Sequence, residues 1–89
     1  QSALSKWLSE NLKYPMAAKR MGVEGKVVVE FVVDENGKIS DVRVKESLHR
    51  QCDEEAIRLV KAMPDWSPAE VNGIKTRHKY TLPIPFVLN

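Results

Sequence analysis

Residues that bind metals or form disulfides are scarce in this sequence of 89 residues, which contains one cysteine and two histidines. Cys52 alone cannot form an internal disulfide, and neither His49 nor His78 has a second ligand at metal-binding spacing. We therefore predict no metal site and no cofactor. Cys52 is interpreted as a packed structural cysteine, because no basic partner that would activate a nucleophile stands near it in the sequence.

The sequence also lacks an excess of one charge and a long apolar run. Its net charge of +2 is too small to indicate nucleic-acid binding, and no run approaches the ~18 apolar residues of a membrane-spanning helix. Gly22 and Gly25 lack the spacing of a phosphate-binding loop. The acidic run Asp53 to Glu55 is explained by helix capping and by the helix dipole. We predict no catalytic residue and no enzyme.

The composition is that of one small globular domain, with 43% apolar and 29% charged residues. The chain starts at Gln1, with neither an initiator methionine nor a signal-peptide pattern. We therefore expect it to be part of a longer protein. Residues 1–12 are interpreted as an N-terminal amphipathic helix or the end of a linker, and residues 13–89 as the domain itself.

The most informative stretch is the last one, Lys75 to Leu88, whose period-two alternation predicts one long β-strand. The apolar face carries His78, Tyr80, Leu82, Ile84, Phe86 and Leu88, and the other face carries Lys75, Arg77, Lys79, Thr81, Pro83, Pro85 and Val87. The amide hydrogens that Pro83 and Pro85 lack would point to the same edge of the strand. Proline is tolerated in sheets where no ladder bond is lost. The sequence therefore predicts an edge strand that is paired on one side only.

The N-terminal half of this strand is the candidate binding site, because an open row of backbone groups can dock a partner strand. The candidate partner-binding residues are Lys75, Thr76, Arg77, His78, Lys79, Tyr80 and Thr81. Three of these residues are basic and could form a rail for an acidic partner. A solvated strand face explains them equally well.

The elements upstream follow from periodicity and from turn residues. The expected elements are a helix from Ser2 to Leu12 with Ser2 as a possible cap, a helix from Pro15 to Met21, a strand from Glu24 to Asp34, a turn from Asp34 to Gly37, a strand from Lys38 to Glu46, a loop from Ser47 to Gln51, a helix capped by Asp53 that ends at Pro64, and a turn at Asn72 and Gly73. Tyr14 and Trp66, each beside a proline, are expected to close the two ends of the core.

The order of these elements predicts the topology of the sheet. A hairpin followed by a helical crossover places the last strand beside the first and parallel to the second. The expected fold is a two-layer α+β domain. It has a three-stranded antiparallel or mixed sheet of order 2-1-3, with its helices on one face.

These landmarks together resemble the C-terminal domain of the TonB family of energy transducers, from Leu12 to Asn89. The motifs that carry the resemblance are Tyr14-Pro15, Gly22-Val23-Glu24-Gly25, Asn36-Gly37-Lys38-Ile39, Asp53-Glu54-Glu55-Ala56, Met63-Pro64-Asp65-Trp66-Ser67-Pro68 and Tyr80-Thr81-Leu82-Pro83-Ile84-Pro85-Phe86. Each motif alone is weak, and the combination is specific. The last two resemble the versions found in Bacteroidetes-type sequences. Cys52 departs from the leucine that the family often carries before the helix-capping Asp.

The resemblance implies a function in transport across the outer membrane. Such proteins are anchored in the inner membrane, span the periplasm, and bind a short receptor segment, the TonB box, as an extra strand on the last strand of this domain. They pass on proton-motive force from an inner-membrane motor complex, so that TonB-dependent outer-membrane receptors import siderophores, cobalamin or glycans.

Two alternatives remain open at this stage. TonB-like domains also end membrane sensor proteins that carry a metallopeptidase domain, where the domain would be a regulatory or sensory module. The same strand edge could also pair with a second copy of the chain in a homodimer.

Overall fold

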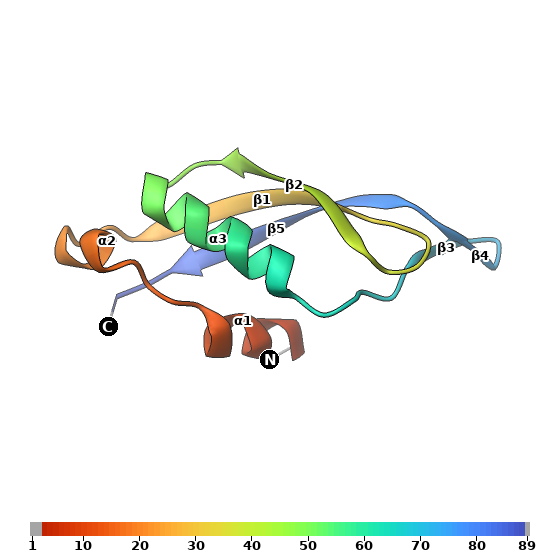
Figure 1. The fold of residues 1–89 in the computed structure, drawn as a ribbon, viewed down its shortest axis with the longest axis horizontal. Helices are drawn as coiled ribbons and strands as arrows, with labels where there is room; N and C mark the ends of the chain where they lie inside the picture. Colours follow the sequence, from red (N-terminus) through yellow and green to blue (C-terminus); the bar gives the residue numbers. More distant parts are fainter. Residues whose placement is uncertain (1–2, 89) are drawn as a thin grey trace.

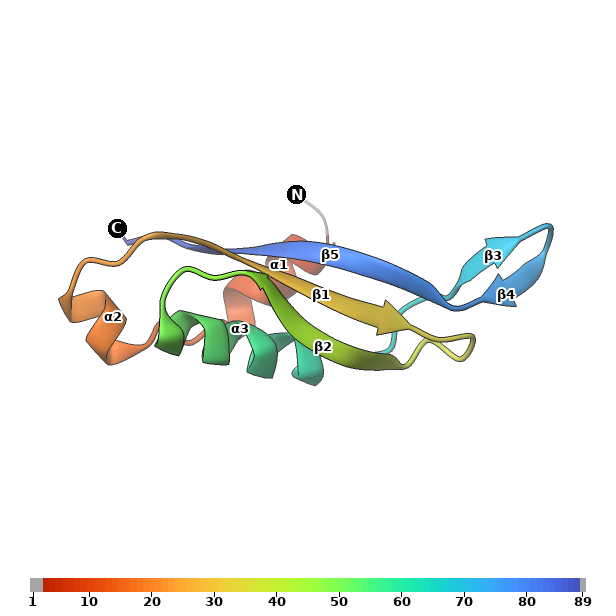
Figure 2. The ribbon, with the colours of Figure 1, turned by 90° about the horizontal axis from the view of Figure 1, so that it is seen from above.

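The computed structural model describes residues 3–88, and its elements form one layer of sheet and one layer of helix (Figure 1). In chain order the elements are α1 (Ala3–Asn11), α2 (Met16–Arg20), β1 (Gly25–Val33), β2 (Ile39–Glu46), α3 (Arg50–Ala62), β3 (Ala69–Val71), β4 (Ile74–Thr76) and β5 (His78–Phe86). Helices α2 and α3 lie on one side of the sheet, which is clearest from above, and α1 lies along the edge of β5 (Figures 1 and 2).

The three long strands form an antiparallel sheet in the order β2-β1-β5. Strand β1 is antiparallel to both of its neighbours, so β5 runs parallel to β2. The two-layer α+β fold predicted from the sequence is confirmed, including the strand order. Strand β1 is central, which agrees with its apolar residues on both faces, since Val28 is half-buried and Val32 is 7% exposed.

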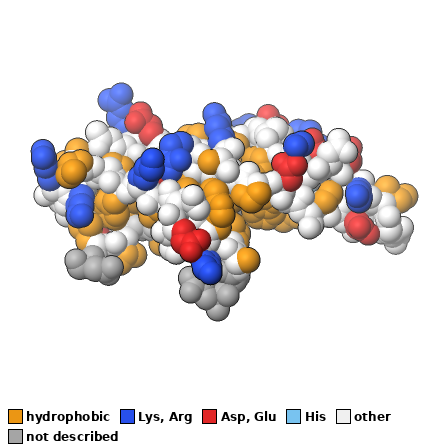
Figure 3. All heavy atoms as spheres, turned by 60° about the horizontal axis from the view of Figure 1, so that its bottom comes forward, with side chains coloured by type: hydrophobic (Ala, Val, Ile, Leu, Met, Phe, Trp, Pro, Cys, Tyr) orange, Lys and Arg blue, Asp and Glu red, His pale blue; other side chains and the backbone are white. Residues whose placement is uncertain are grey.

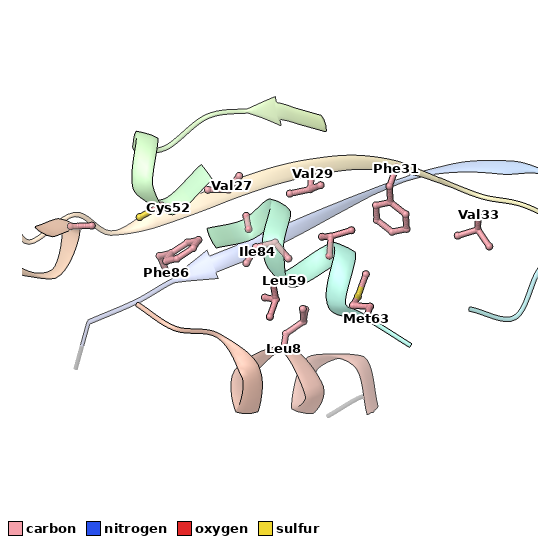
Figure 4. Close-up of a cluster of buried hydrophobic side chains, with 13 residues drawn as sticks. Leu8, Val27, Val29, Phe31, Val33, Cys52, Leu59, Met63, Ile84 and Phe86 are labelled. Carbon is pink, nitrogen blue, oxygen red and sulfur yellow. The ribbon is translucent and has the colours of Figure 1, made fainter. Parts of the chain in front are cut away.

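The core lies between the sheet and helix α3, and alternate residues of β1 and β5 point into it (Figure 4). The buried hydrophobic residues of the core are Leu8, Ala18, Val27, Val29, Phe31, Val33, Cys52, Ala56, Leu59, Val60, Met63, Ile84 and Phe86. Helix α3 presents its members at intervals of three and four, as an amphipathic helix on a sheet requires. In α2 Ala18 alone is buried, whereas Ala17 and Met21 are exposed.

The turn between β1 and β2 is fixed by one carboxylate and one glycine. Asp34 Oδ1 accepts hydrogen bonds from the backbone N–H groups of Asn36 at 2.8 Å and Lys38 at 2.9 Å. Gly37 has a φ of +82°, as the predicted turn requires, and a Cβ there would lie 2.1 Å from the carbonyl oxygen of Trp66. The Trp66 N–H also donates to the Gly37 carbonyl at 2.9 Å. This glycine is therefore needed both for the turn and for docking the segment that follows α3.

The prediction of one continuous strand from Lys75 to Leu88 is wrong. The chain forms two strands, β4 and β5, with Arg77 between them, and β4 pairs with β3 in a separate two-stranded sheet. The β3–β4 hairpin projects beyond the end of the main sheet (Figures 1 and 2). Its turn is the expected pair Asn72 and Gly73, with φ of +53° and +80°. An Asn-Gly pair between two β-branched residues, Val71 and Ile74, is a strong hairpin signal. This pair predicted the turn alone, and not the two short strands on either side.

The start of helix α3 also differs from the prediction. The helix begins at Arg50, and its N-cap is His49, whose Nδ1 accepts a hydrogen bond from the Gln51 N–H at 3.2 Å. Asp53, the predicted cap, lies within the first turn and instead accepts hydrogen bonds from the Ser47 hydroxyl and the Leu48 N–H. Its carboxylate stabilises the turn that leads into the helix. His49, which the sequence places in a loop, is thus the capping residue of α3.

Helix α1 packs against the domain through one face. Leu8 is buried in the core, and Leu4, Trp7 and Leu12 are partly buried against it. The link after the helix is held by Glu55, which accepts hydrogen bonds from the Lys13 N–H and from the Arg58 guanidinium, each at 2.7 Å. The expected cap of this helix, Ser2, lies outside the described residues.

Candidate functional site

The open edge of β5 is the candidate site. Strand β5 lies at one end of the strand order and pairs with β1 without interruption from Gly25 opposite Phe86 to Val33 opposite His78. In an antiparallel pair, residues whose backbone groups face the neighbouring strand alternate with residues whose groups face away. The register of β5 therefore decides which main-chain groups a further strand could reach.

The two prolines identify which residues of β5 have backbone groups that face away from β1. Pro83 stands opposite Val28 and Pro85 opposite Lys26, at positions where β1 loses no hydrogen bond from their missing N–H. Lys79 and Thr81 share this parity, so their N–H and C=O groups point away from β1. The outward edge thus offers donors and acceptors at Lys79 and Thr81, and carbonyl acceptors alone at Pro83 and Pro85. A guest strand can pair most fully beside the first half of β5.

Aromatic packing holds this first half in place on the helix side. The ring of Tyr80 lies 5.1 Å from the ring of Trp66 and 6.1 Å from that of Phe31, and the Phe31 and Trp66 rings meet edge to face at 5.2 Å. The imidazole of His78 packs on Tyr80 at 4.7 Å. Such pairs stabilise a fold by about 0.5–1.5 kcal/mol each beyond their buried area. These contacts hold the first half of β5 against the core.

The opposite end of the core is closed by the other predicted aromatic residue. The Tyr14 ring meets Phe86 edge to face at 5.5 Å, and the Tyr14 hydroxyl donates a hydrogen bond to the Val23 carbonyl. Burial raises the pKa of the Tyr14 hydroxyl above its usual value, and the nearby Cys52 and Glu24 side chains make smaller contributions in the same direction. The expectation that Tyr14 and Trp66 close the two ends of the core is confirmed.

Two of the three residues in the predicted basic rail are engaged in ion pairs on the outer face of the sheet. Arg77 Nη2 donates to Asp41 Oδ2 at 3.1 Å, and Lys79 Nζ lies 3.8 Å from Glu30 Oε1. Asp41 adopts a φ of +51° at a bulge in β2. Exposed pairs of this kind contribute about 0–1 kcal/mol each, so a partner's carboxylate could compete for these cations. An acidic partner would therefore have to displace these pairs to bind Arg77 or Lys79.

The structure places the seven predicted site residues in two strands and at the break between them, where Arg77 lies. Lys75 and Thr76 belong to β4 and pair with Glu70 and Ala69 of the projecting hairpin. The residues from His78 to Thr81 lie in β5, beside β1. Within β5, Lys79 and Thr81 face the open edge with their backbones, whereas His78 and Tyr80 face β1.

A groove beside the same edge was not predicted. It has a volume of about 680 Å³ and lies between α1 and the second half of β5. Its lining residues are Leu4, Ser5, Leu8, Ser9, Leu12, Tyr14, Lys26, Leu82, Pro83, Ile84, Pro85 and Val87. The apolar stripe of α1 was visible in the sequence, but the element against which it packs was not.

Cys52, the other group with the chemistry of a candidate site, lies in the core. Cys52 is fully buried, and burial raises the pKa of its thiol, to which the charge of Asp53 adds. Between residues 3 and 88, no group of His, Cys, Asp and Glu side chains could hold a metal ion. Nor is any helix in that range long and apolar enough to cross a membrane.

Known proteins resemble this chain in both sequence and fold. The sequence model of the family described as Gram-negative bacterial TonB protein C-terminal matches residues 10–88. Protein TonB of Xanthomonas campestris pv. campestris (strain B100) is 37% identical over 78 residues, which cover 86% of this chain and 34% of that protein. Protein TonB of Yersinia enterocolitica is 40% identical over 47 residues, which cover 53% of this chain and 18% of that protein.

The fold also matches a solved structure. The NMR solution structure of Helicobacter pylori TonB-CTD superimposes with a TM-score of 0.72 at 20% sequence identity, covering 97% of this chain and 78% of that one. At this identity the likeness concerns the fold. The chain spans about a third or less of the length of the curated relatives that it matches.

Proposed function

Because the chain belongs to the family of Gram-negative bacterial TonB C-terminal domains, we propose that it binds outer-membrane receptors by adding their TonB box as a strand to the open edge of β5. In this proposal it is the periplasmic end of an energy transducer. The rest of the protein tethers it to the inner membrane and to the proton-driven motor complex. The imported cargo would be a siderophore, cobalamin or a glycan.

The observation that carries this proposal is that both prolines of β5 lie at positions whose backbone groups face away from β1. Pro83 and Pro85 stand where a missing N–H disturbs no bond to β1, and this leaves the backbone groups of Lys79 and Thr81 on the open side. Main-chain pairing provides affinity that tolerates different receptor sequences, as a shared transducer requires. Because the hydrogen bonds of an added strand lie side by side, a pull along β5 loads several of them together.

The seven residues proposed from the sequence contribute unequally. The main-chain groups of Lys79 and Thr81 would bond the guest strand directly. The ring contacts of His78 and Tyr80 would hold this part of β5 in place on the helix side of the sheet. Lys75, Thr76 and Arg77 lie beyond the start of β5, where they would meet the end of the guest strand or the receptor surface around it.

An NMR titration with a synthetic TonB-box peptide tests the proposal. The amide signals of Lys79 and Thr81 should shift and become protected from hydrogen exchange, while those of Val42 and Val44 on the far strand stay unchanged. Shifts confined to another surface would contradict strand addition at β5. Light scattering on the free domain provides a control, because a homodimer through this edge should dissociate as the peptide binds.

A further inference from the structure

The groove between α1 and β5 opens at the edge where the guest strand is proposed to bind. Its lining includes Leu82 and Ile84 from the helix side of β5, and Pro83 and Pro85, whose backbone groups face away from β1. Helix α1 runs along this edge on the helix side (Figures 1 and 2). Figure 3, which brings the lower edge of Figure 1 forward, shows hydrophobic side chains exposed between charged groups on this face.

The hydrogen-bonding chemistry of the edge changes along β5 in the direction of the groove. Beside the groove, Pro83 and Pro85 offer no backbone donor to a guest strand. Main-chain pairing is therefore weaker there than beside Lys79 and Thr81. A guest that extends along the whole of β5 needs another source of affinity in this half.

Alternation in the guest strand provides that source. Every second side chain of an added strand points to the helix side of the sheet, and the rest point to the outer side. On the helix side they would meet the groove, with the leucines of α1 on one wall and Leu82 and Ile84 on the other. On the outer side they would meet solvent and the exposed side chains of Lys79 and Thr81.

We infer that this groove is a specificity subsite that takes apolar side chains at alternate positions of the added strand, with α1 as its outer wall. The inference rests on the proposed strand addition and goes beyond it by stating what the guest must carry. The guest is amphipathic across its two faces, with an aliphatic residue at every second position opposite Leu82 to Pro85. Helix α1 is then part of the receptor-reading surface.

The test compares two short synthetic peptides on the domain. In the first, valine alternates with glutamate and threonine, and in the second each valine is replaced by the isosteric threonine. Backbone pairing is the same for both, so a difference in affinity comes from the guest side chains that face the helix side of the sheet. We expect the valine peptide to bind at least about tenfold more tightly, from partial burial of its methyl groups. Equal affinities would overturn the inference, and this comparison needs no variant of the domain.

A matched pair of variants places the effect at the groove. Ser9 lines the groove and is exposed, whereas the neighbouring Glu10 is exposed on the same helix outside it. Ser9→Phe should fill the groove and reduce the preference for valine to about twofold or less, while Glu10→Phe should retain it. If Ser9→Phe retained the full preference, the inference would be wrong.

The same titrations test the groove subsite and strand addition at β5 separately. If both peptides shift the Lys79 and Thr81 amides with equal affinity, strand addition stands and the groove has no role as a subsite. If neither peptide shifts them, strand addition at β5 is itself refuted, and the inference falls with it.

Discussion

Substituting proline at two adjacent positions of β5 tests the assignment of its two edges. Lys79 and His78 both have exposed side chains, so their replacement removes little buried area. Their backbones face opposite ways, because His78 stands opposite Val33 with its groups toward β1 and Lys79 has its groups toward the open edge. We expect Lys79→Pro to weaken partner binding strongly while the domain stays folded, and His78→Pro to destabilise the domain itself.

The magnitudes follow from the hydrogen bonds affected. Lys79→Pro loses one net hydrogen bond to the guest strand, about 0.5–1.5 kcal/mol, and leaves a guest carbonyl unpaired at a further 1–3 kcal/mol. The sum, about 1.5–4.5 kcal/mol, corresponds to roughly 10-fold to 2,000-fold weaker binding. The stability cost of Lys79→Pro is limited to its exposed pair with Glu30, about 0–1 kcal/mol.

His78→Pro acts on the domain itself. It removes a donor to β1 and leaves a carbonyl of that strand unpaired, which costs about 1–3 kcal/mol of folding free energy. The melting temperature falls by about 4–8 °C for each kcal/mol lost in a domain of this size. The two substitutions therefore have opposite signatures, although they are neighbours in the sequence.

Two measurements check this pair. Calorimetry or urea unfolding gives the stability of each variant, and isothermal titration with a TonB-box peptide gives its affinity. The reasoning would be refuted if Lys79→Pro unfolded the domain as severely as His78→Pro does. Undiminished peptide affinity in a folded Lys79→Pro variant would equally refute it, because the ring would then stand where the guest strand is proposed to pair.

Three further predictions concern the parts that hold the site in place. Gly37→Ala should destabilise the domain by about 2–4 kcal/mol in urea unfolding, because of its positive φ and the 2.1 Å approach of a Cβ to the Trp66 carbonyl; a neutral effect would mean that this approach relaxes freely. Cys52 should resist thiol reagents in the native domain and react after denaturation, because it is fully buried and its pKa is raised. Glu55→Gln should cost about 1–2 kcal/mol at neutral pH, and the cost should disappear in acid unfolding.

The sign of the Glu55 effect follows from its lowered pKa. Burial raises the pKa of this carboxyl, but hydrogen bonds from Arg58 and from the Lys13 N–H, with the charges of both residues, outweigh it and lower the pKa below the ordinary 4.5. A carboxyl whose pKa is lower in the folded state stabilises the fold fully above the unfolded value. That contribution is lost as the pH falls below 4.5 and through the folded pKa. If the variant and the wild type differed equally at all pH values, this account would be wrong.

The sequence predicted correctly those features that depend on a strand's own period. Alternation in β5 identified its buried face, and the spacing of Pro83 and Pro85 identified its open edge, because the pleat and the missing N–H are local properties. The strand order 2-1-3 followed from a hairpin and a helical crossover, which leave few arrangements. Candidate residues in β5 could therefore be named without coordinates.

The predictions that failed are those where a local signal competed with a contact distant in the sequence. Alternation continues through Lys75 to Thr81, yet Arg77 breaks the strand, and its side chain pairs with Asp41 of β2. Asp53 is a good cap by residue type, but Leu48 and Ser47 use its carboxylate, and His49 caps the helix. Residue preferences did not distinguish between these competing partners.

The sequence by itself determined the sheet, its order and the edge of β5 that stays open, because each follows from periodicity, turns and the chemistry of proline. Only the tertiary structure decided where α1 lies, and thus that a groove borders this edge. That position depends on the packing of Leu8 into the core and on the hydrogen bond from the Lys13 N–H to Glu55. This hydrogen bond joins residues that are 42 positions apart in the chain. No local pattern records such a contact, because its free energy comes from surfaces that meet only after folding.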